Sequence, residues 1–166
     1  MSETTQPCSE ISQREKLAKL AGNWKGLAKV WFEPGEPVDT SKAEGTIRPV
    51  MGGKWMLFEY KGSFQGKPLE GLAILGFHNA LKRFEFAWID SFHTYPGIMF
   101  SEGQRDVDRF SALGSYAYVT PETEQHWGWR TEFELQNDNS LVVTAYNISP
   151  EGEESLATQA VYKRQS

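Results

Sequence analysis

The sequence has one cysteine, Cys8, among its 166 residues, and a lone thiol excludes a disulfide within the chain. The N-terminal segment "MSETTQPCSE" also lacks the basic stretch and the apolar stretch that together mark a secretory signal peptide. Such sparse use of cysteine is typical of proteins from reducing compartments. We therefore expect a cytoplasmic location.

Long apolar runs and basic clusters are missing too. A transmembrane helix needs roughly 20 apolar residues, and "LAILGF" is among the longest apolar runs in this chain. The net charge is −5, with acidic and basic residues interspersed. The sequence has no block of Lys and Arg that could bind along a phosphate backbone or an anionic membrane surface. We therefore expect neither a nucleic acid nor a membrane as partner.

Motifs for metal binding or nucleophilic chemistry are also absent from the sequence. The histidines, His78, His93 and His126, are far apart in the chain and have no cysteine near them, so they form no recognisable metal site. "GGK" lacks the other residues of a phosphate-binding loop, and no serine stands in a Gly-x-Ser-x-Gly turn. The sequence therefore contains no motif for a metal, a cofactor or a catalytic residue.

Strand-like runs make up most of what the sequence does contain. Residues 1–10 are expected to be a flexible tail, and the capping box "SQRE" that begins at Ser12 predicts a short helix ending at Gly22. About ten alternating runs follow, separated by short turns, and short connections favour antiparallel pairing of neighbours. A sheet of this size tends to close. The runs lie near 24–33, 43–51, 54–63, 68–77, 83–91, 97–105, 109–119, 125–136, 140–148 and 155–163.

We therefore predict an all-β fold, an antiparallel up-and-down barrel of about ten strands with one short N-terminal helix, in a single domain over residues 11–166. Alternation assigns the faces of the strands. In "HWGWRTEFEL", Trp127 and Trp129 share the apolar face, while His126 is on the charged face. In "RFEFAWID", Trp88 and Asp90 share the aromatic face. Asp90 is then expected to point inward at a strand end, near a mouth of the barrel.

Several segments resemble a bacterial family known as domain of unknown function 1579. These segments are "LAGNWKGLAKVWFEPGEP", "GGKWMLFEYKG", "GKPLEGLAILGFHNALKRFEFAWID" and "GIMFSEG". The Gly-x-Trp around Trp24 also resembles the opening of lipocalins and related calycins, where the Trp plugs the closed end of the barrel. The resemblance implies a calycin-like barrel with an interior cavity, and it supplies no activity.

Glu59, Asp90 and His93 can each be compared with that family. Glu59 in "FEYKG" resembles an acid that the family also carries. In the family the segment between Trp-x-Asp and "GIM" is compact, whereas this chain has "SFHTYP" there. His93 belongs to this variable segment, so the resemblance implies no role for it. For Asp90, a capping role that anchors the 91–97 loop is expected, with His93 exposed on that loop.

A barrel of about ten strands is wider than one of eight, which side chains nearly fill, so some cavity should remain. We expect this cavity to bind a small apolar or aromatic molecule. The candidate ligand-binding residues are Trp24, Glu59, Trp88, Asp90, His93, Trp127 and Trp129.

Other interpretations of the same residues stay open at this point. Asp90 and His93 could form an acid–base pair of a small enzyme at the barrel mouth. Haem could bind to a single axial His78 or His93, as in some calycin-like barrels. Glu59 could form a structural ion pair with Arg48. The barrel could also be packed solid as a structural module, and the sequence leaves a homodimer open.

Overall fold

The structure, a computed structural model, describes the chain from residue 10 to residue 166. The expected tail, with Cys8, lies outside the described residues except for Glu10. Helix α1 spans Glu10–Ala18 and confirms the predicted N-terminal helix. It begins before Ser12, which therefore lies in its first turn rather than at the cap. Within residues 10–166, no helix has the length and the apolar character needed to cross a membrane.

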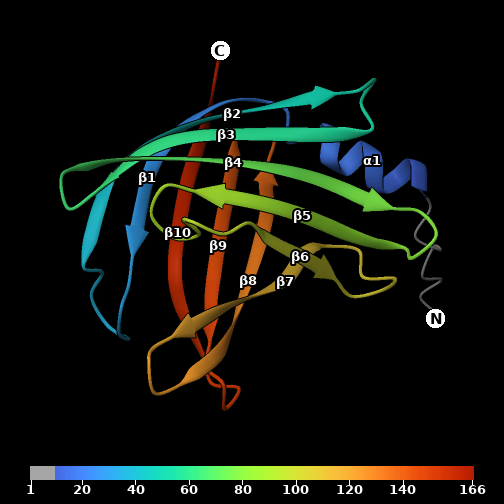
Figure 1. Ribbon diagram of the computed structural model, residues 1–166. Coiled ribbons are helices and arrows are strands. Elements are labelled where there is room, and N and C mark those ends of the chain that lie inside the picture. Colours follow the sequence, from blue (N-terminus) through green and yellow to red (C-terminus); the bar gives the residue numbers. More distant parts are fainter. Residues whose placement is uncertain (1–9) are drawn as a thin grey trace, which may run out of the picture.

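Ten strands follow the helix and close into an antiparallel barrel (Figure 1). Each strand pairs with its neighbours in the chain, and β1 pairs with β10 to close the barrel. The predicted all-β up-and-down barrel with one short helix is therefore confirmed. The strands are β1 (Gly22–Val30), β2 (Asp39–Val50), β3 (Trp55–Phe64), β4 (Lys67–His78), β5 (Arg83–Asp90), β6 (Met99–Gly103), β7 (Phe110–Val119), β8 (Glu124–Asn137), β9 (Ser140–Ile148) and β10 (Glu154–Gln165).

Helix α1 lies against one end of the barrel, in contact with β3 and β4 (Figure 1). Leu17 in its last turn and Leu20 just after it are buried. Trp24 of β1 is fully buried, and its indole N–H donates to the Leu20 carbonyl oxygen at 3.0 Å. The guanidinium carbon of Arg164 lies 4.3 Å from the centre of the Trp24 ring. Trp24 thus closes the helix end of the barrel.

Aromatic side chains fill much of the barrel interior. Phe133 of β8 makes edge-to-face contacts with three other rings, Phe58, Phe86 and Phe110, at centroid distances of 5.7, 5.7 and 5.1 Å. Such pairs add to the stabilisation from apolar burial. The inward face predicted for β8 is confirmed, because Trp129 and Phe133 are buried there while His126 is exposed.

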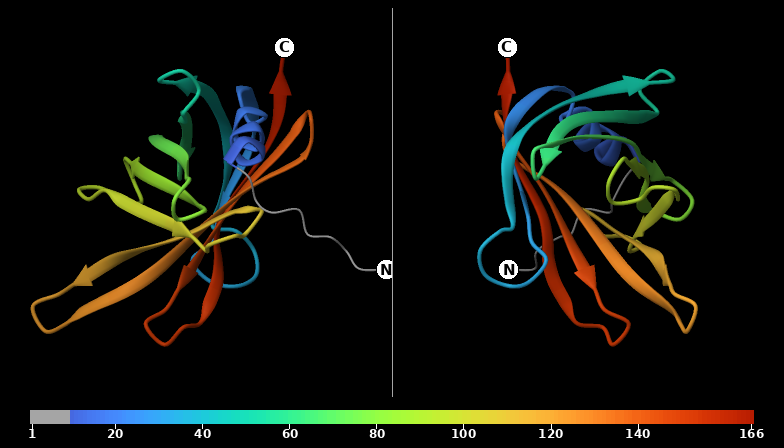
Figure 2. Two further views of the ribbon diagram at one scale, coloured as in Figure 1. Left: turned by 90° about the vertical axis from the view of Figure 1, so that its right-hand side faces the viewer. Right: turned by 60° about the vertical axis from the view of Figure 1, so that its left-hand side comes forward.

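The opposite end of the barrel is formed by hairpins and two longer loops. Figure 2 shows the β7–β8 and β9–β10 hairpins extending away from α1. At this end, Phe64 stacks on Phe92 with ring centroids 4.4 Å apart, and Phe32 lies 5.8 Å from Phe64. We call Phe32, Phe64 and Phe92 the aromatic rim. Phe32 lies in the β1–β2 loop, Phe64 ends β3 and Phe92 lies in the 91–98 loop, so the rim ties that loop to the barrel mouth.

Candidate functional site

A cavity of about 110 Å³ lies inside the barrel. One part of its wall consists of small side chains, contributed by β1, β2, β9 and β10: Ala28, Ala43, Ala145 and Ala160. Strands β3, β5 and β8 contribute aromatic rings: Phe58, Tyr60, Phe86, Trp88, Trp129 and Phe133. The cavity persists because alanines stand where larger side chains would fill the space. It is small because the rings occupy most of the barrel.

Asp90 is the last residue of β5 and is 5% exposed. Its Oδ1 accepts the backbone N–H groups of Phe92 at 2.7 Å and of His93 at 2.8 Å. Its Oδ2 accepts the hydroxyl of Tyr60, and the Trp88 indole N–H donates to that hydroxyl oxygen at 2.8 Å. The expected inward orientation of Asp90 and its cap on the following turn are both present. The carboxylate is held by partners on both oxygens.

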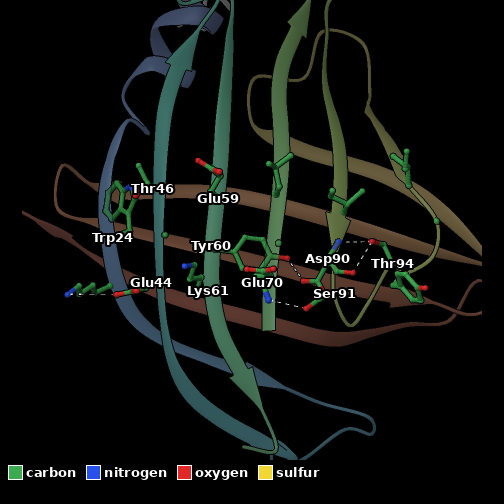
Figure 3. A pocket seen from close by; sticks show the side chains of 18 of the residues that line it. Trp24, Glu44, Thr46, Glu59, Tyr60, Lys61, Glu70, Asp90, Ser91 and Thr94 are labelled. Atoms are coloured by element: carbon green, nitrogen blue, oxygen red, sulfur yellow. Dashed lines mark hydrogen bonds and ion pairs between the residues drawn. The ribbon is translucent and has the colours of Figure 1, made fainter. Parts of the chain in front are cut away.

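Tyr60 reaches Asp90 across β4. Tyr60 pairs with Gly71, which in turn pairs with Asp90 on the next strand. A Cβ atom at Gly71 would lie 2.1 Å from the Tyr60 ring, so a residue with a side chain cannot occupy this position without displacing the ring. Figure 3 shows the Tyr60 ring directed towards Asp90, with Ser91 and Thr94 following on the loop.

The environment of Asp90 favours its charged form. Burial of the carboxyl group raises its pKa. The hydrogen bond from the His93 side chain, the positive charge of a protonated His93 and the hydrogen bond from the Tyr60 hydroxyl together lower the pKa by more than burial raises it. The net effect holds the pKa of Asp90 below its ordinary value of 3.8. Burial and the neighbouring Asp90 charge raise the pKa of Tyr60 well above 10.0. Tyr60 is therefore the donor and Asp90 the ionised acceptor.

His93 directs its imidazole into the cavity rather than to solvent, and its side chain is 16% exposed. The expectation of a histidine exposed on the loop is therefore wrong. The cause is Asp90, whose Oδ1 lies 3.1 Å from Nδ1 of His93 and turns the ring inward. The ring centroids of Trp88 and Trp129 lie 5.8 and 5.6 Å from the His93 ring. Its Nε2 is buried and has no hydrogen-bond partner among the described residues.

Trp88 and Trp129 form the flat part of the cavity wall. Their rings are stacked, with centroids 5.7 Å apart and an interplanar angle of 26°. Trp129 Nε1 and Thr131 Oγ1 are buried without a hydrogen-bond partner in the part of the chain that the structure describes. Both residues line the cavity.

Four of the candidate residues thus meet at the cavity: Trp88, Asp90, His93 and Trp129. Trp24 lies at the helix end and does not line it. Trp127 is half-buried and stands opposite Tyr116 on β7, before β8 begins to pair with β9, so it lies towards the projecting hairpin. These positions leave Trp24 and Trp127 outside the cavity wall.

Glu59 points to the outer face of the barrel, where its side chain is 53% exposed. Its Oε2 lies 3.8 Å from Nε of Arg48, as in the structural ion pair considered from the sequence. Glu59 lines a hollow of about 1020 Å³ on the outer face of β1–β5, under the 91–98 loop (Figure 3). Lys25 and Glu44 of this hollow form a second pair at 3.9 Å. Exposed pairs of this kind add little to stability.

Tyr60 and Thr131 were missed as site residues in the sequence. The signal for Tyr60 was present, because Met56, Phe58 and Tyr60 alternate on β3 and share its inward face. Thr131 stands on the predicted inward face of β8, and a single threonine on an apolar face gives no sequence signal for binding. Alternation therefore identified the positions but gave them no role.

The other histidines, like His93 all within the described chain, lie away from the cavity. His78 is exposed at the end of β4, and its Nδ1 accepts the Leu81 backbone N–H at 3.2 Å. His126 is exposed and lies 3.0 Å from Glu124. Within residues 10–166, no three His, Cys, Asp or Glu side chains gather as a metal-binding group. A cavity of about 110 Å³ has no room for haem beside His93.

The sequence matches the family model described as "Protein of unknown function (DUF1579)" over residues 9–164. The chain belongs to the DUF1579 family. Among curated proteins, no match to this DUF1579 chain was found.

Solved structures with the same barrel fold include Rv2717c from M. tuberculosis, with a TM-score of 0.59 and 14% identity, covering 93% of this chain and 98% of that one. The S-type phycobiliprotein lyase CPES from Guillardia theta has a TM-score of 0.54 and 13% identity, covering 95% and 97% of the two chains. At such identities the likeness shows the fold alone.

Proposed function

We propose that this DUF1579 protein binds a small, flat, apolar or aromatic molecule inside its barrel. The observation that carries the proposal is the cavity beside the stacked Trp88 and Trp129 rings, with His93 as the polar group between them and Asp90. Ligand sites commonly combine an apolar wall with a few polar groups that orient the ligand. The polar groups here are held rigidly, because Asp90 is fixed by two backbone N–H groups.

The size of the cavity limits the ligand. An apolar cavity of about 150 Å³ in a protein core can bind benzene, and this cavity measures about 110 Å³. A single ring is therefore the largest group that the space can enclose. Phe64 and Leu69, beside the β3–β4 connection, also line the cavity. A substituent on the ring can extend towards the aromatic rim at this end.

The comparisons support the proposal only through the fold. One protein with this barrel, at 13% identity, is named a phycobiliprotein lyase. That name associates the fold with an enzyme. The ligand of the present chain has to be inferred from its own cavity.

A second candidate function has one observation in its favour. The Asp90–His93 pair leaves His93 Nε2 buried in the cavity wall without a described partner, where a bound molecule could give it a proton. A histidine oriented by a carboxylate is a common general base. The protein would then catalyse proton transfer on a small carbonyl compound.

Hydrogen exchange tests the enzyme alternative. Acetophenone in D₂O would lose its methyl proton signal faster with wild-type protein than with His93→Phe. Exchange no faster than in buffer would contradict this alternative.

Ligand-detected NMR tests the binding proposal. Saturation transfer from the protein to toluene is expected for wild type, and Trp88→Ala and Trp129→Ala should weaken binding about tenfold through loss of ring contacts. His126→Ala is the matched control, because His126 is exposed away from the cavity. Equal effects of the three substitutions, with all variants folded by thermal melting, would contradict binding at this cavity.

A further inference from the structure

Three polar atoms without a partner belong to side chains that line the same cavity. They are His93 Nε2, Trp129 Nε1 and Thr131 Oγ1, each buried and unbonded within the described chain. Buried polar groups in native proteins are nearly always hydrogen-bonded, and an unsatisfied group costs free energy. Because all three side chains line one cavity, a polar group of a bound molecule is the candidate partner for these atoms.

The bonding capacity of the three atoms differs. Nδ1 of His93 lies 3.1 Å from the Asp90 carboxylate, so this nitrogen carries a proton, and Nε2 is an acceptor when the ring is neutral and a donor when it is protonated. The Trp129 indole can only donate. The Thr131 hydroxyl can donate or accept, since its hydrogen rotates.

A hydroxyl group matches this set. It has one hydrogen to donate to His93 Nε2, and two lone pairs to accept from Trp129 and Thr131. If His93 is protonated instead, the neutral hydroxyl accepts from His93 and Trp129 and donates its hydrogen to Thr131, so the same uncharged molecule fits both states of the imidazole. A carbonyl oxygen lacks the hydrogen that neutral His93 needs, and an apolar ring satisfies none of the three atoms.

The rest of the cavity selects what carries the hydroxyl. The Trp88, Trp129 and His93 rings lie mutually 5.6–5.8 Å apart, centroid to centroid, and form an aromatic surface that favours a flat ring packed against it. A carboxylate on that ring would bring a second negative charge close to Asp90, and like charges in a buried site repel. The cavity is therefore suited to an uncharged ring that bears a hydroxyl.

We infer that the ligand of this barrel is a phenol, a single aromatic ring whose hydroxyl bonds to His93, Trp129 and Thr131. The inference rests on the proposed function, since it specifies the molecule that the same cavity binds. The ring supplies apolar contact area, and the hydroxyl distinguishes a phenol from a ring of the same size without a hydroxyl. A site that hydrogen-bonds a hydroxyl rejects the analogue without it more strongly than an apolar site can.

Calorimetric titrations with phenol and toluene separate the two claims, because toluene has nearly the same size and lacks the hydroxyl. Wild type is expected to bind both, with phenol at least about tenfold tighter. Thr131→Val keeps the shape and removes one hydroxyl, and it should weaken phenol about threefold to tenfold while leaving toluene unchanged. His93→Phe should lower the phenol-to-toluene affinity ratio further. His126→Phe is the control and should change neither affinity.

The outcomes are distinguishable. Binding of both molecules with a ratio that Thr131→Val and His93→Phe do not change would overturn the phenol inference and leave the binding proposal standing. Tighter binding of benzoate than of phenol would overturn it as well. Failure of wild type to bind either toluene or phenol would overturn both the inference and the proposed function.

Discussion

Asp90 and His93 are joined at two points, because Asp90 Oδ1 accepts the His93 backbone N–H at 2.8 Å and lies 3.1 Å from His93 Nδ1. The first contact fixes the turn after β5, and the second fixes the orientation of the ring. The 91–97 loop is tied further by Thr94, whose Oγ1 accepts the Asp90 backbone N–H at 2.7 Å. One carboxylate thus determines where the loop lies and where the imidazole of His93 points.

Substitution of Asp90 should affect stability in a graded way. Asp90→Asn keeps an acceptor oxygen for the loop and should lower the free energy of unfolding by about 1–2 kcal/mol. Asp90→Ala leaves the N–H groups of Phe92 and His93 and the Tyr60 hydroxyl without their acceptor, so the loss should exceed that of Asn. Urea unfolding measures both. Limited proteolysis should also cut Asp90→Ala faster between Ser91 and Gly97. Variants that melt like wild type with a protected loop would rule out this anchoring role.

The acid limb of the stability curve should depend on Asp90. Its pKa is lowered in the folded protein from 3.8, so the unfolded chain takes up this proton first as the pH falls. The contribution of Asp90 is therefore present above the unfolded pKa and is lost as the pH falls through the folded pKa. Between about pH 5 and pH 2, the free energy of unfolding should decline less steeply for Asp90→Asn than for wild type. Parallel curves would show that the carboxylate charge makes no folded-state contribution.

The aromatic rim should control the rate of ligand exchange. Phe64 stacks on Phe92 at 4.4 Å and also lines the cavity. Phe64→Ala removes this contact and should speed both association and dissociation of toluene in stopped-flow fluorescence, with a smaller change in affinity. Leu113→Ala, at an exposed position on β7, is the control. Identical rates in wild type and Phe64→Ala would mean that the ligand enters elsewhere.

The barrel could be predicted from the sequence because alternation with period two is a local signal. Trp88 and Asp90 were assigned to the inward face for this reason, as was Trp129, and all three line the cavity. The same parity also places Glu59 outward and Tyr60 inward. Glu59 was chosen as a site residue because it resembles an acid of the family, but its neighbour Tyr60 is the residue that lines the cavity.

The remaining features depend on contacts between distant residues. His93 turns inward because of Asp90, and Asp90 in turn bonds to Tyr60, which is two strands away and reaches it over Gly71. No local pattern encodes this path. The cavity volume is also a packing property, since it depends on which alanines of β1, β2, β9 and β10 lie opposite one another across the barrel.

Binding inside the barrel can be observed through the indole N–H signals in a ¹⁵N–¹H NMR titration with toluene. Single Trp→Phe variants assign the six signals. Trp88 and Trp129 line the cavity, whereas Trp24 is buried at the helix end and serves as an internal control. Binding inside the barrel should give saturable shifts for Trp88 and Trp129 and leave the Trp24 signal stationary. Stationary Trp88 and Trp129 signals up to the solubility limit of toluene, or shifts as large for Trp24, would contradict it.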